Sequence, residues 1–254
     1  MRERLLGQAR ACAELGSPMY AELLTRAADD AGGIVEEVLG ERTETGFVLG
    51  MLGTVHRFVL EGRVPDLAAH YPTAGGTKDP LGAWPAFRDV LIAHAEEISA
   101  ALADPPQTNE VGRASPLVGG LLTVAGATGG LPVRLLEIGA SAGLNLRADH
   151  FRILYEGGGY GPESPVVLPD AWRGAVPAEV PLVVAERLGC DLAPLDPGSA
   201  DARRRLLSYV WPDQAARVGR LRAAFEPGLD ALPNLGTIAL LAIGAWRVSA
   251  DAIT

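Results

Sequence analysis

Apolar residues recur every three or four positions through the first half of the chain, which is the spacing that gives a helix one buried face. The stretches with this pattern are 5–13, 18–31, 47–59, 84–102 and 116–128. Residues that stop a helix follow them, among them Gly16, Gly62 and the pair Pro105-Pro106. Ser17 and Pro18 are residue types that commonly begin a helix. The pattern predicts a helical N-terminal region over residues 1–128.

After residue 128 the pattern changes to short, mostly apolar runs between turn residues. Val133–Ile138 and Val180–Ala185 are of this kind and predict buried parallel strands. Helical spacing returns from Asp201 to Phe225, with a break at Trp211-Pro212, and Thr237–Ile243 predicts one further strand. Residues 129–254 therefore predict a Rossmann-like nucleotide-binding region. The expected fold is α/β, a helical N-terminal region followed by an incomplete Rossmann-like parallel sheet.

The segment from Glu137 to Asn145 gives the strongest indication of a binding site. Between a predicted strand and a predicted helix it has a turn of small residues, Gly139, Ala140, Ser141, Ala142 and Gly143. Small side chains let the backbone approach a ligand, and the first turn of a helix offers its N–H groups. We expect a ligand at this turn. A tight strand-to-helix connection without a ligand is the alternative.

One interpretation of the turn is a cofactor site. E-x-G-x-S-x-G is close to the E/D-x-G-x-G-x-G signature of class I methyltransferases. In those enzymes the acid ends the first strand, and the amino-acid portion of S-adenosylmethionine lies over the glycines. An acid at the end of the second strand accepts the ribose hydroxyls, and Asp191 has the matching place here. Asp191 follows at more than twice the expected ~20 residues, so the Gly- and Pro-rich stretch Glu156–Pro181 must be an insertion.

A second interpretation is a hydrolase. Gly139 to Gly143 fits G-x-S-x-G, the nucleophile elbow of α/β-hydrolases, with Ser141 as the nucleophile. That mechanism needs an acid and then a histidine later in the chain. The only histidine after Ser141 is His150, on the helix predicted to begin at the turn and too close in sequence to fold back over it. The hydrolase is therefore the less favoured interpretation.

A polar loop precedes the small-residue helix and contains four hydrogen-bonding residues, Thr108, Asn109, Glu110 and Arg113. They either cap that helix or face a substrate or cofactor, and both possibilities stay open. His56 lies on an apolar stripe and is expected to be a half-buried core residue. Asp149 and His150 are expected at the surface. No spacing typical of a metal site occurs, so no metal is expected.

Composition narrows the classes of partner. The formal net charge is −9 and the pI about 5.0, so the surface repels phosphate backbones and nucleic-acid binding is not expected. The triplet Arg203–Arg205 indicates a solvated helix face. Cys12 and Cys190 are too few and too far apart for a metal or disulfide framework. The N-terminus is too charged for a secretory signal, and apolar runs are shorter than a membrane span. We expect a soluble, cytoplasmic protein.

The sequence also resembles a bacterial family known only as domain of unknown function 2332. The resemblance rests on five stretches: Cys12 with Gly16-Ser17-Pro18, Gln107–Arg113, Leu136–Leu146, Glu186–Asp191 and Tyr209–Gln214. It implies a methyltransferase-like, Rossmann-type second half and carries no settled activity. After Phe225 the likeness fades, and the tail to Thr254 predicts a truncated sheet. A frameshift or early stop and simple divergence are the two explanations.

Two functional hypotheses follow. The first is a methyltransferase that uses S-adenosylmethionine on an unknown small acceptor positioned by the helical N-terminal region. The second is a non-catalytic or degenerate nucleotide-binding protein. Methyl transfer depends mainly on positioning, so the absence of an obvious base in the sequence does not separate them. The acceptor and the oligomeric state cannot be predicted from the sequence.

Overall fold

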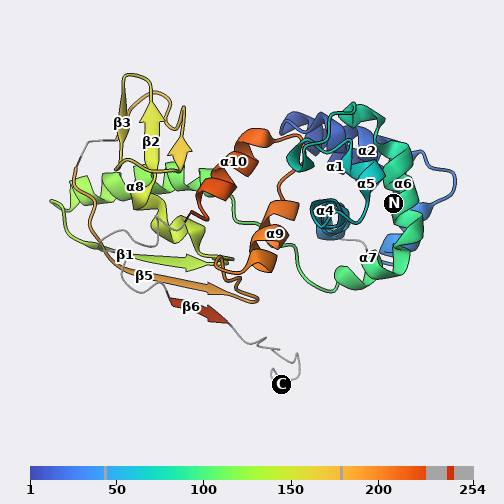
Figure 1. Cartoon of the computed structure of the whole chain (residues 1–254). Helices are drawn as coiled ribbons and strands as arrows, with labels where there is room; N and C mark the ends of the chain where they lie inside the picture. Colours follow the sequence, from blue (N-terminus) through green and yellow to red (C-terminus); the bar gives the residue numbers. More distant parts are fainter. Residues whose placement is uncertain (43–44, 178–179, 227–238, 243–254) are drawn as a thin grey trace. The chain divides into compact units, whose positions relative to one another are not determined.

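The computed structural model describes residues 1–42, 45–177, 180–226 and 239–242 of a chain that divides into two compact units (Figure 1). One unit consists of Met1–Thr108 and Arg203–Val218, and the other of Asn109–Ala202 and Gly219–Thr254. The first is helical and the second contains the sheets. The domain boundary near residue 129 stays a prediction.

The helices before the sheet region follow the apolar pattern. They are α1 (Arg2–Glu14), α2 (Pro18–Ala28), α3 (Ile34–Leu39), α4 (Thr45–Leu60), α5 (Pro65–Ala68), η1 (Pro72–Ala74), η2 (Pro80–Gly82), α6 (Trp84–Ala93) and α7 (Ala95–Ala101). The Ser17 side chain accepts a hydrogen bond from Tyr20 N–H and caps α2, as predicted. The single helix predicted over 84–102 is two, because the chain bends at His94 (φ −128°) between α6 and α7.

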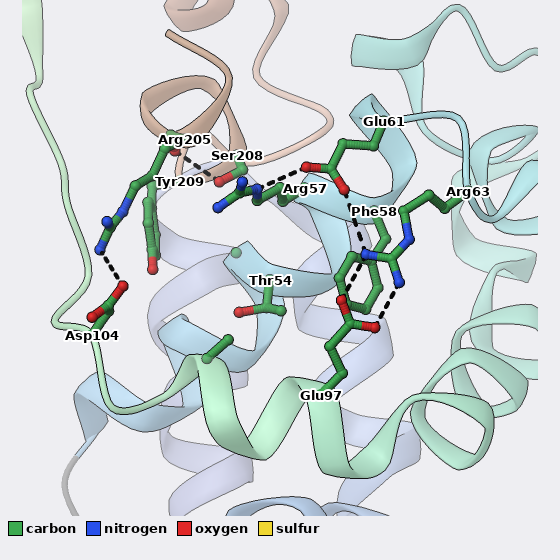
Figure 2. A pocket seen from close by; sticks show the side chains of 12 residues that line it. Thr54, Arg57, Phe58, Glu61, Arg63, Glu97, Asp104, Arg205, Ser208 and Tyr209 are labelled. Carbon is green, nitrogen blue, oxygen red and sulfur yellow. Dashed lines mark hydrogen bonds and ion pairs between the residues drawn. The ribbon is translucent and has the colours of Figure 1, made fainter. Parts of the chain in front are cut away.

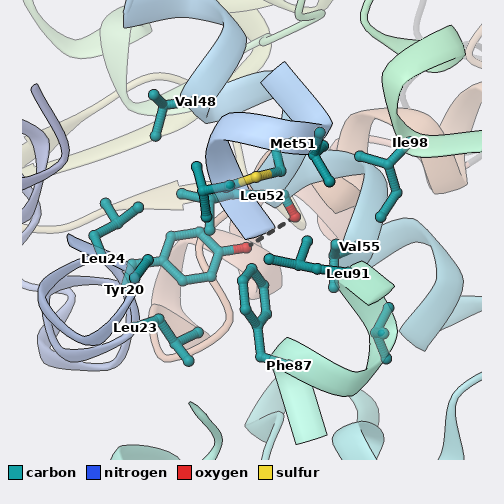
Figure 3. Packing of buried hydrophobic residues seen from close by; sticks show 14 of the residues in the cluster. Tyr20, Leu23, Leu24, Val48, Met51, Leu52, Val55, Phe87, Leu91 and Ile98 are labelled. Carbon is teal, nitrogen blue, oxygen red and sulfur yellow. Dashed lines mark hydrogen bonds between the residues drawn. The ribbon is translucent and has the colours of Figure 1, made fainter. Parts of the chain in front are cut away.

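The core of the helical unit surrounds α4 (Figure 3). Side chains from α2, α4, α6 and α7 interdigitate there, among them Leu23, Met51, Phe87 and Ile98, each 0–1% exposed. Full burial of one such side chain contributes about 1.5–3 kcal/mol. The Tyr20 hydroxyl donates to the Leu52 carbonyl at 3.4 Å, so this phenol enters the core with its polar atom satisfied.

The second unit contains a three-stranded parallel sheet. Its described elements are η3 (Val111–Arg113), α8 (Ala114–Ala127), β1 (Val133–Ile138), η4 (Leu144–His150), β2 (Arg152–Tyr155), β3 (Gly158–Tyr160), β4 (Val167–Leu168), β5 (Val184–Asp191) and β6 (Ala239–Ala242). The strand order is β1-β5-β6, and all neighbours are parallel. The α/β class is confirmed. The second strand begins at Val184, later than predicted.

The stretch predicted to be an insertion between β1 and β5 contains strands of its own. A second small sheet has the order β3-β2-β4, with β3 antiparallel and β4 parallel to β2. Trp172, which follows β4, donates its indole N–H to the Ser115 carbonyl of α8 at 3.0 Å. A Cβ at Gly119 would lie 3.1 Å from that indole. The small residues of α8 therefore let this aromatic side chain pack against the helix.

The α-helix predicted directly behind the glycine turn does not form. The chain instead makes η4, a 3₁₀ helix of seven residues, and then enters β2. A 3₁₀ helix this short has a weaker dipole and fewer free N–H groups than a long α-helix. This changes what the turn can bind.

The two faces of the parallel sheet differ. On one face Leu135 and its register partner Arg187 are buried, and the Arg187 guanidinium donates to the Leu146 carbonyl of η4 at 2.8 Å. On the other face Leu136 is 60% and Ile138 89% exposed. The exposed edge predicted near Ile238–Ile243 has its outer residues outside the described part of the chain.

Helices α9 (Ala200–Ser208) and α10 (Ala215–Ala223) flank the predicted break at Trp211-Pro212. Among the residues described here, no helix has both the length and the apolar character needed to cross a membrane.

Candidate functional site

The glycine turn lies where β1 and β5 both end. The N–H groups of Gly139 and Ala140 donate to the Cys190 carbonyl at 2.8 and 3.1 Å, so the turn is held against the last residues of β5. Three residues of the turn have positive φ: Gly139 (+70°), Ser141 (+53°) and Gly143 (+67°). Glycine adopts this region without strain, whereas serine does not. The neighbouring contacts therefore fix Ser141 in an unfavourable conformation.

Asp191, the last residue of β5, supplies the decisive contact. One carboxylate oxygen accepts from the Ser141 N–H at 2.8 Å, and the other from the Ala193 N–H at 2.9 Å. The sequence predicts that Asp191 accepts ribose hydroxyls from the end of the second strand. In the structure its side chain contacts the turn. Its observed role is to join the two strand ends. A carboxylate has about four lone-pair positions, so a ribose role is compatible with these two bonds and stays a prediction.

The polar loop before α8 contacts the same turn. Asn109 Oδ1 accepts from the Leu144 N–H at 3.0 Å, and the Asn145 amide donates to the Glu110 carbonyl at 3.3 Å. Glu110 Oε1 accepts from the Gly112 N–H at 2.9 Å and caps η3. Glu110 thus caps η3, whereas α8, the helix that the loop was predicted to cap, has no side-chain cap. The loop also supports the turn. Asn109 therefore accepts a hydrogen bond from the first N–H group of η4, which would otherwise be free to bind a phosphate.

Glu137 has one carboxylate oxygen without a hydrogen-bond donor in the described part of the structure. Its Oε2 atom is buried and has no hydrogen-bond partner among the described residues, and the same is true of Asn145 Oδ1. Burial raises the pKa of the Glu137 carboxyl, and the neighbouring Asn145 amide and Arg113 charge oppose this effect. A buried polar atom without a partner costs about 1–3 kcal/mol. Two such acceptors at one turn favour a ligand that brings donors.

The accessible part of the turn is smaller than predicted. Ala140, Ser141 and Ala142 are 0–3% exposed, whereas Gly139 is exposed and a Cβ added to it would meet open space. Among the five turn residues, therefore, only the Gly139 backbone is open to a ligand, because residues 140–143 are buried.

A family model described as an uncharacterized protein conserved in bacteria (DUF2332) matches residues 2–236. The chain belongs to this family. The match extends beyond Phe225, where the likeness was expected to fade. Neither the curated proteins nor the solved structures contain a significant match to the chain.

The stretches that carry the family resemblance meet in two places. In the second unit Asn109, the glycine turn and Asp191 form the site described above. In the helical unit the Ser17 hydroxyl donates to Asp213 at 2.6 Å, and the Met19 N–H donates to the same carboxylate at 2.9 Å. This second cluster fastens the start of α2 to the segment after α9. It has a structural explanation that needs no ligand.

The burial of Asp149 and His150 differs from the sequence prediction. Both side chains are mostly buried, with 11% and 14% exposure, and were expected at the surface. The reason is Arg187, whose guanidinium makes two 2.7 Å hydrogen bonds to the Asp149 carboxylate beneath the sheet. A buried arginine requires such a partner. Sequence reasoning missed Arg187 because the predicted strand ended at Ala185, whereas β5 continues to Asp191 and includes it. An arginine inside a strand of a parallel sheet is the signal that could have found it.

The geometry does not support a hydrolase. Ser141 is 2% exposed, so no substrate reaches its hydroxyl from solvent. His150 lies 3.4 Å from Arg187 and 3.6 Å from Asp149 and is held there. A nucleophile elbow needs an exposed serine and a base beside it.

The remaining predicted residues lie at the margin of the site. Arg113 is exposed and acts on Glu137 through its charge. Thr108 is exposed and belongs to the helical unit. His56 was predicted to be a half-buried core residue, and the structure buries it fully. Among the described residues no group of three or more potential metal ligands occurs.

Proposed function

We propose that this protein binds S-adenosylmethionine at the carboxyl ends of β1 and β5 and transfers its methyl group to a small acceptor. The observation that carries the proposal is the pair of buried acceptors without partners, Glu137 Oε2 and Asn145 Oδ1, beside the exposed Gly139 backbone. The α-ammonium group of the cofactor supplies the donors that these atoms lack. The parallel strands and the turn between them agree with this position.

The hydrogen-bonding groups at the turn disfavour a nucleotide that carries phosphate groups. A phosphate needs N–H donors or cations, and at this turn Gly139, Ala140, Ser141 and Leu144 already donate their N–H groups within the protein. The Glu137 side chain, two residues before Gly139, is a carboxylate, which repels a phosphate and attracts an ammonium. A ligand with an amino-acid portion therefore matches the turn better than a dinucleotide does.

In this proposal the protein contributes binding and orientation. The sulfonium of the bound cofactor supplies an activated methyl group. Glu137 and Asn145 hold the amino-acid end, and the Gly139 backbone allows close approach because it has no side chain. Bringing acceptor and methyl group into line accounts for much of the rate enhancement in such a reaction. The absence of a catalytic base from the described site is compatible with that chemistry.

Calorimetry tests the binding step. The full chain is titrated with S-adenosylmethionine, its demethylated product S-adenosylhomocysteine, and ATP as the phosphate-bearing comparator. We expect both adenosyl compounds to bind and ATP not to. Glu137→Ala should weaken binding at least about tenfold, since it removes one partner of a charge-assisted pair. Glu186→Ala on β5 removes an exposed carboxylate that pairs with Arg134 and should change nothing.

Two results would contradict parts of the proposal. If neither adenosyl compound binds at millimolar concentration, or if ATP binds more tightly, the cofactor assignment is wrong. If both bind but no methyl is transferred to any acceptor in a cell extract with labelled cofactor, the non-catalytic alternative holds.

A further inference from the structure

The helical unit contains a cavity of about 220 Å³ that is separate from the turn (Figure 2). Its walls come from the second half of α4, from α7 and the residues after it, and from the end of α9 with Tyr209. Six charged side chains line it: Arg57, Arg63, Arg205, Glu61, Glu97 and Asp104. Pockets for drug-sized ligands span roughly 300–1,000 Å³, so this cavity suits a smaller molecule.

The charges around the cavity are balanced in pairs. Arg57 Nε lies 2.8 Å from Glu61, and Arg63 makes two hydrogen bonds of 2.8 and 2.6 Å to Glu97. Arg205 lies 3.3 Å from Asp104. Partly exposed pairs of this kind contribute about 1 kcal/mol or less each, so a ligand can exchange with them at little cost. A ligand with a net charge would pair with one member of such an ion pair and leave the other member without an opposite charge. A zwitterion offers an opposite charge to both members.

Tyr209 forms one wall of the cavity because position 53 is glycine. A Cβ at Gly53 would lie 2.6 Å from the tyrosine ring, so any other residue would push the ring away from α4. Figure 2 shows the ring standing beside the cavity between Arg205 and Thr54. Within the described part of the chain, the Tyr209 hydroxyl makes no hydrogen bond. A half-buried phenol in a polar cavity normally has a partner.

We propose that this cavity binds a small zwitterion of amino-acid size. The ligand carboxylate lies toward Arg57 and the Tyr209 hydroxyl, and its ammonium lies toward Glu97. The site needs neither the cofactor nor the sheet, and it does not depend on the proposed methyl transfer.

Titration calorimetry on the full chain tests this inference. The probes are L-alanine, L-serine and L-glutamine, with succinate, putrescine and glucose as the dianionic, dicationic and uncharged comparators. We expect at least one amino acid to bind with a Kd of about 1 mM or lower and to bind more tightly than every comparator. Tighter binding of any comparator, or no amino-acid binding up to about 10 mM, overturns the proposal.

Variants then locate the site. Tyr209→Phe removes only the hydroxyl and should weaken binding about fivefold, and Arg57→Gln should weaken it about tenfold or more. The control is Arg26→Gln, which breaks a similar four-residue-spaced pair with Glu22 on α2, away from the cavity. It should leave the affinity unchanged. Thermal unfolding shows that each variant is folded. Unchanged affinity in both cavity variants places the ligand elsewhere and refutes this site.

Discussion

The carboxylate of Asp191 accepts a hydrogen bond from the backbone N–H of Ser141 across the ends of two parallel strands, at 2.8 Å. Ser141 has φ +53°, a conformation that costs a non-glycine residue about 1–2 kcal/mol. The bond to a charged acceptor is worth about 1.5–3 kcal/mol. The aspartate therefore offsets the backbone strain of the turn and fixes its shape before any ligand binds.

Replacing Asp191 should destabilise the protein. Asp191→Ala removes the acceptor for both Ser141 and Ala193, and we expect a loss of about 3 kcal/mol in the free energy of unfolding. Urea unfolding measures it. Asp196→Ala is the matched control, because Asp196 accepts from the Gly198 N–H in an exposed turn. That variant should lose less than about 1 kcal/mol. Equal losses would mean that Asp191 has no special role at the strand ends.

Replacement of Gly139 distinguishes the loss of a ligand contact from the effect of backbone strain. Gly139→Ala should cost about 1–2 kcal/mol in stability, since its φ of +70° is unfavourable for alanine. It should also weaken S-adenosylmethionine binding at least about tenfold, because the methyl group projects into the space of the ligand. Gly157→Ala has a similar φ of +81° and equally open surroundings, away from the turn. We expect similar stability losses and normal affinity in that control. Equal affinities in both variants would contradict a ligand at Gly139.

The charged form of Glu137 should lower the free energy of unfolding of the protein while it contributes to cofactor binding. Its folded-state pKa is raised by burial, so the folded state binds the proton more tightly than the unfolded state. The stability from this group is therefore present below its unfolded pKa and is lost as the pH rises through the folded value. Glu137→Gln, neutral at every pH, should raise the free energy of unfolding at pH 7.5 by about 1 kcal/mol.

The same variant should lose cofactor affinity at pH 7.5, which calorimetry measures beside urea unfolding. At a pH below the ordinary glutamate range the stability advantage should disappear, since Glu137 is then protonated in both states. A Glu137→Gln protein that is less stable than the parent at pH 7.5 would show that the carboxylate has partners in the folded state and would remove the main support for the ligand.

Sequence patterns predicted many of the described elements, and the binding role of the glycine turn stays a prediction. β1 has its predicted bounds, α4 follows its apolar stripe, and the side chain of Asp191 at the end of β5 contacts the glycine turn. These features depend on local spacing and on the rule that parallel strands end at one edge. The pattern could not show that Asn109 would occupy the Leu144 N–H, because that contact joins distant segments.

The helix behind the turn was the main error. All five residues from Leu144 to Ala148 are buried, whereas an amphipathic α-helix buries one face only, and the segment forms η4. Tertiary packing decides such a short segment, and Arg187 takes part by bonding the Leu146 carbonyl. An arginine within a strand of a parallel sheet predicts a buried partner, but the sequence does not show which residue that partner is.

His56 gives a pH dependence that the helical unit should show. Its imidazole is fully buried, with Nδ1 3.0 Å from the Ser208 carbonyl and Nε2 2.8 Å from the Thr73 hydroxyl. Burial lowers its pKa to about 4, against opposing hydrogen bonds to the Ser208 and Val210 backbone. In the unfolded chain a histidine titrates near about 6.5. The stability that depends on neutral His56 is therefore present above about pH 6.5 and is lost as the pH falls toward 4.

The expected loss from His56 between pH 7 and pH 5 is about 2 kcal/mol in the free energy of unfolding. Urea unfolding at the two pH values measures it, and His56→Gln should reduce the difference by about that amount, because glutamine does not titrate. His70→Gln serves as the control, because it makes the same replacement at a histidine that is only partly buried. If His56→Gln and the parent lose the same stability between pH 7 and pH 5, protonation of His56 is not what limits the folded state in mild acid.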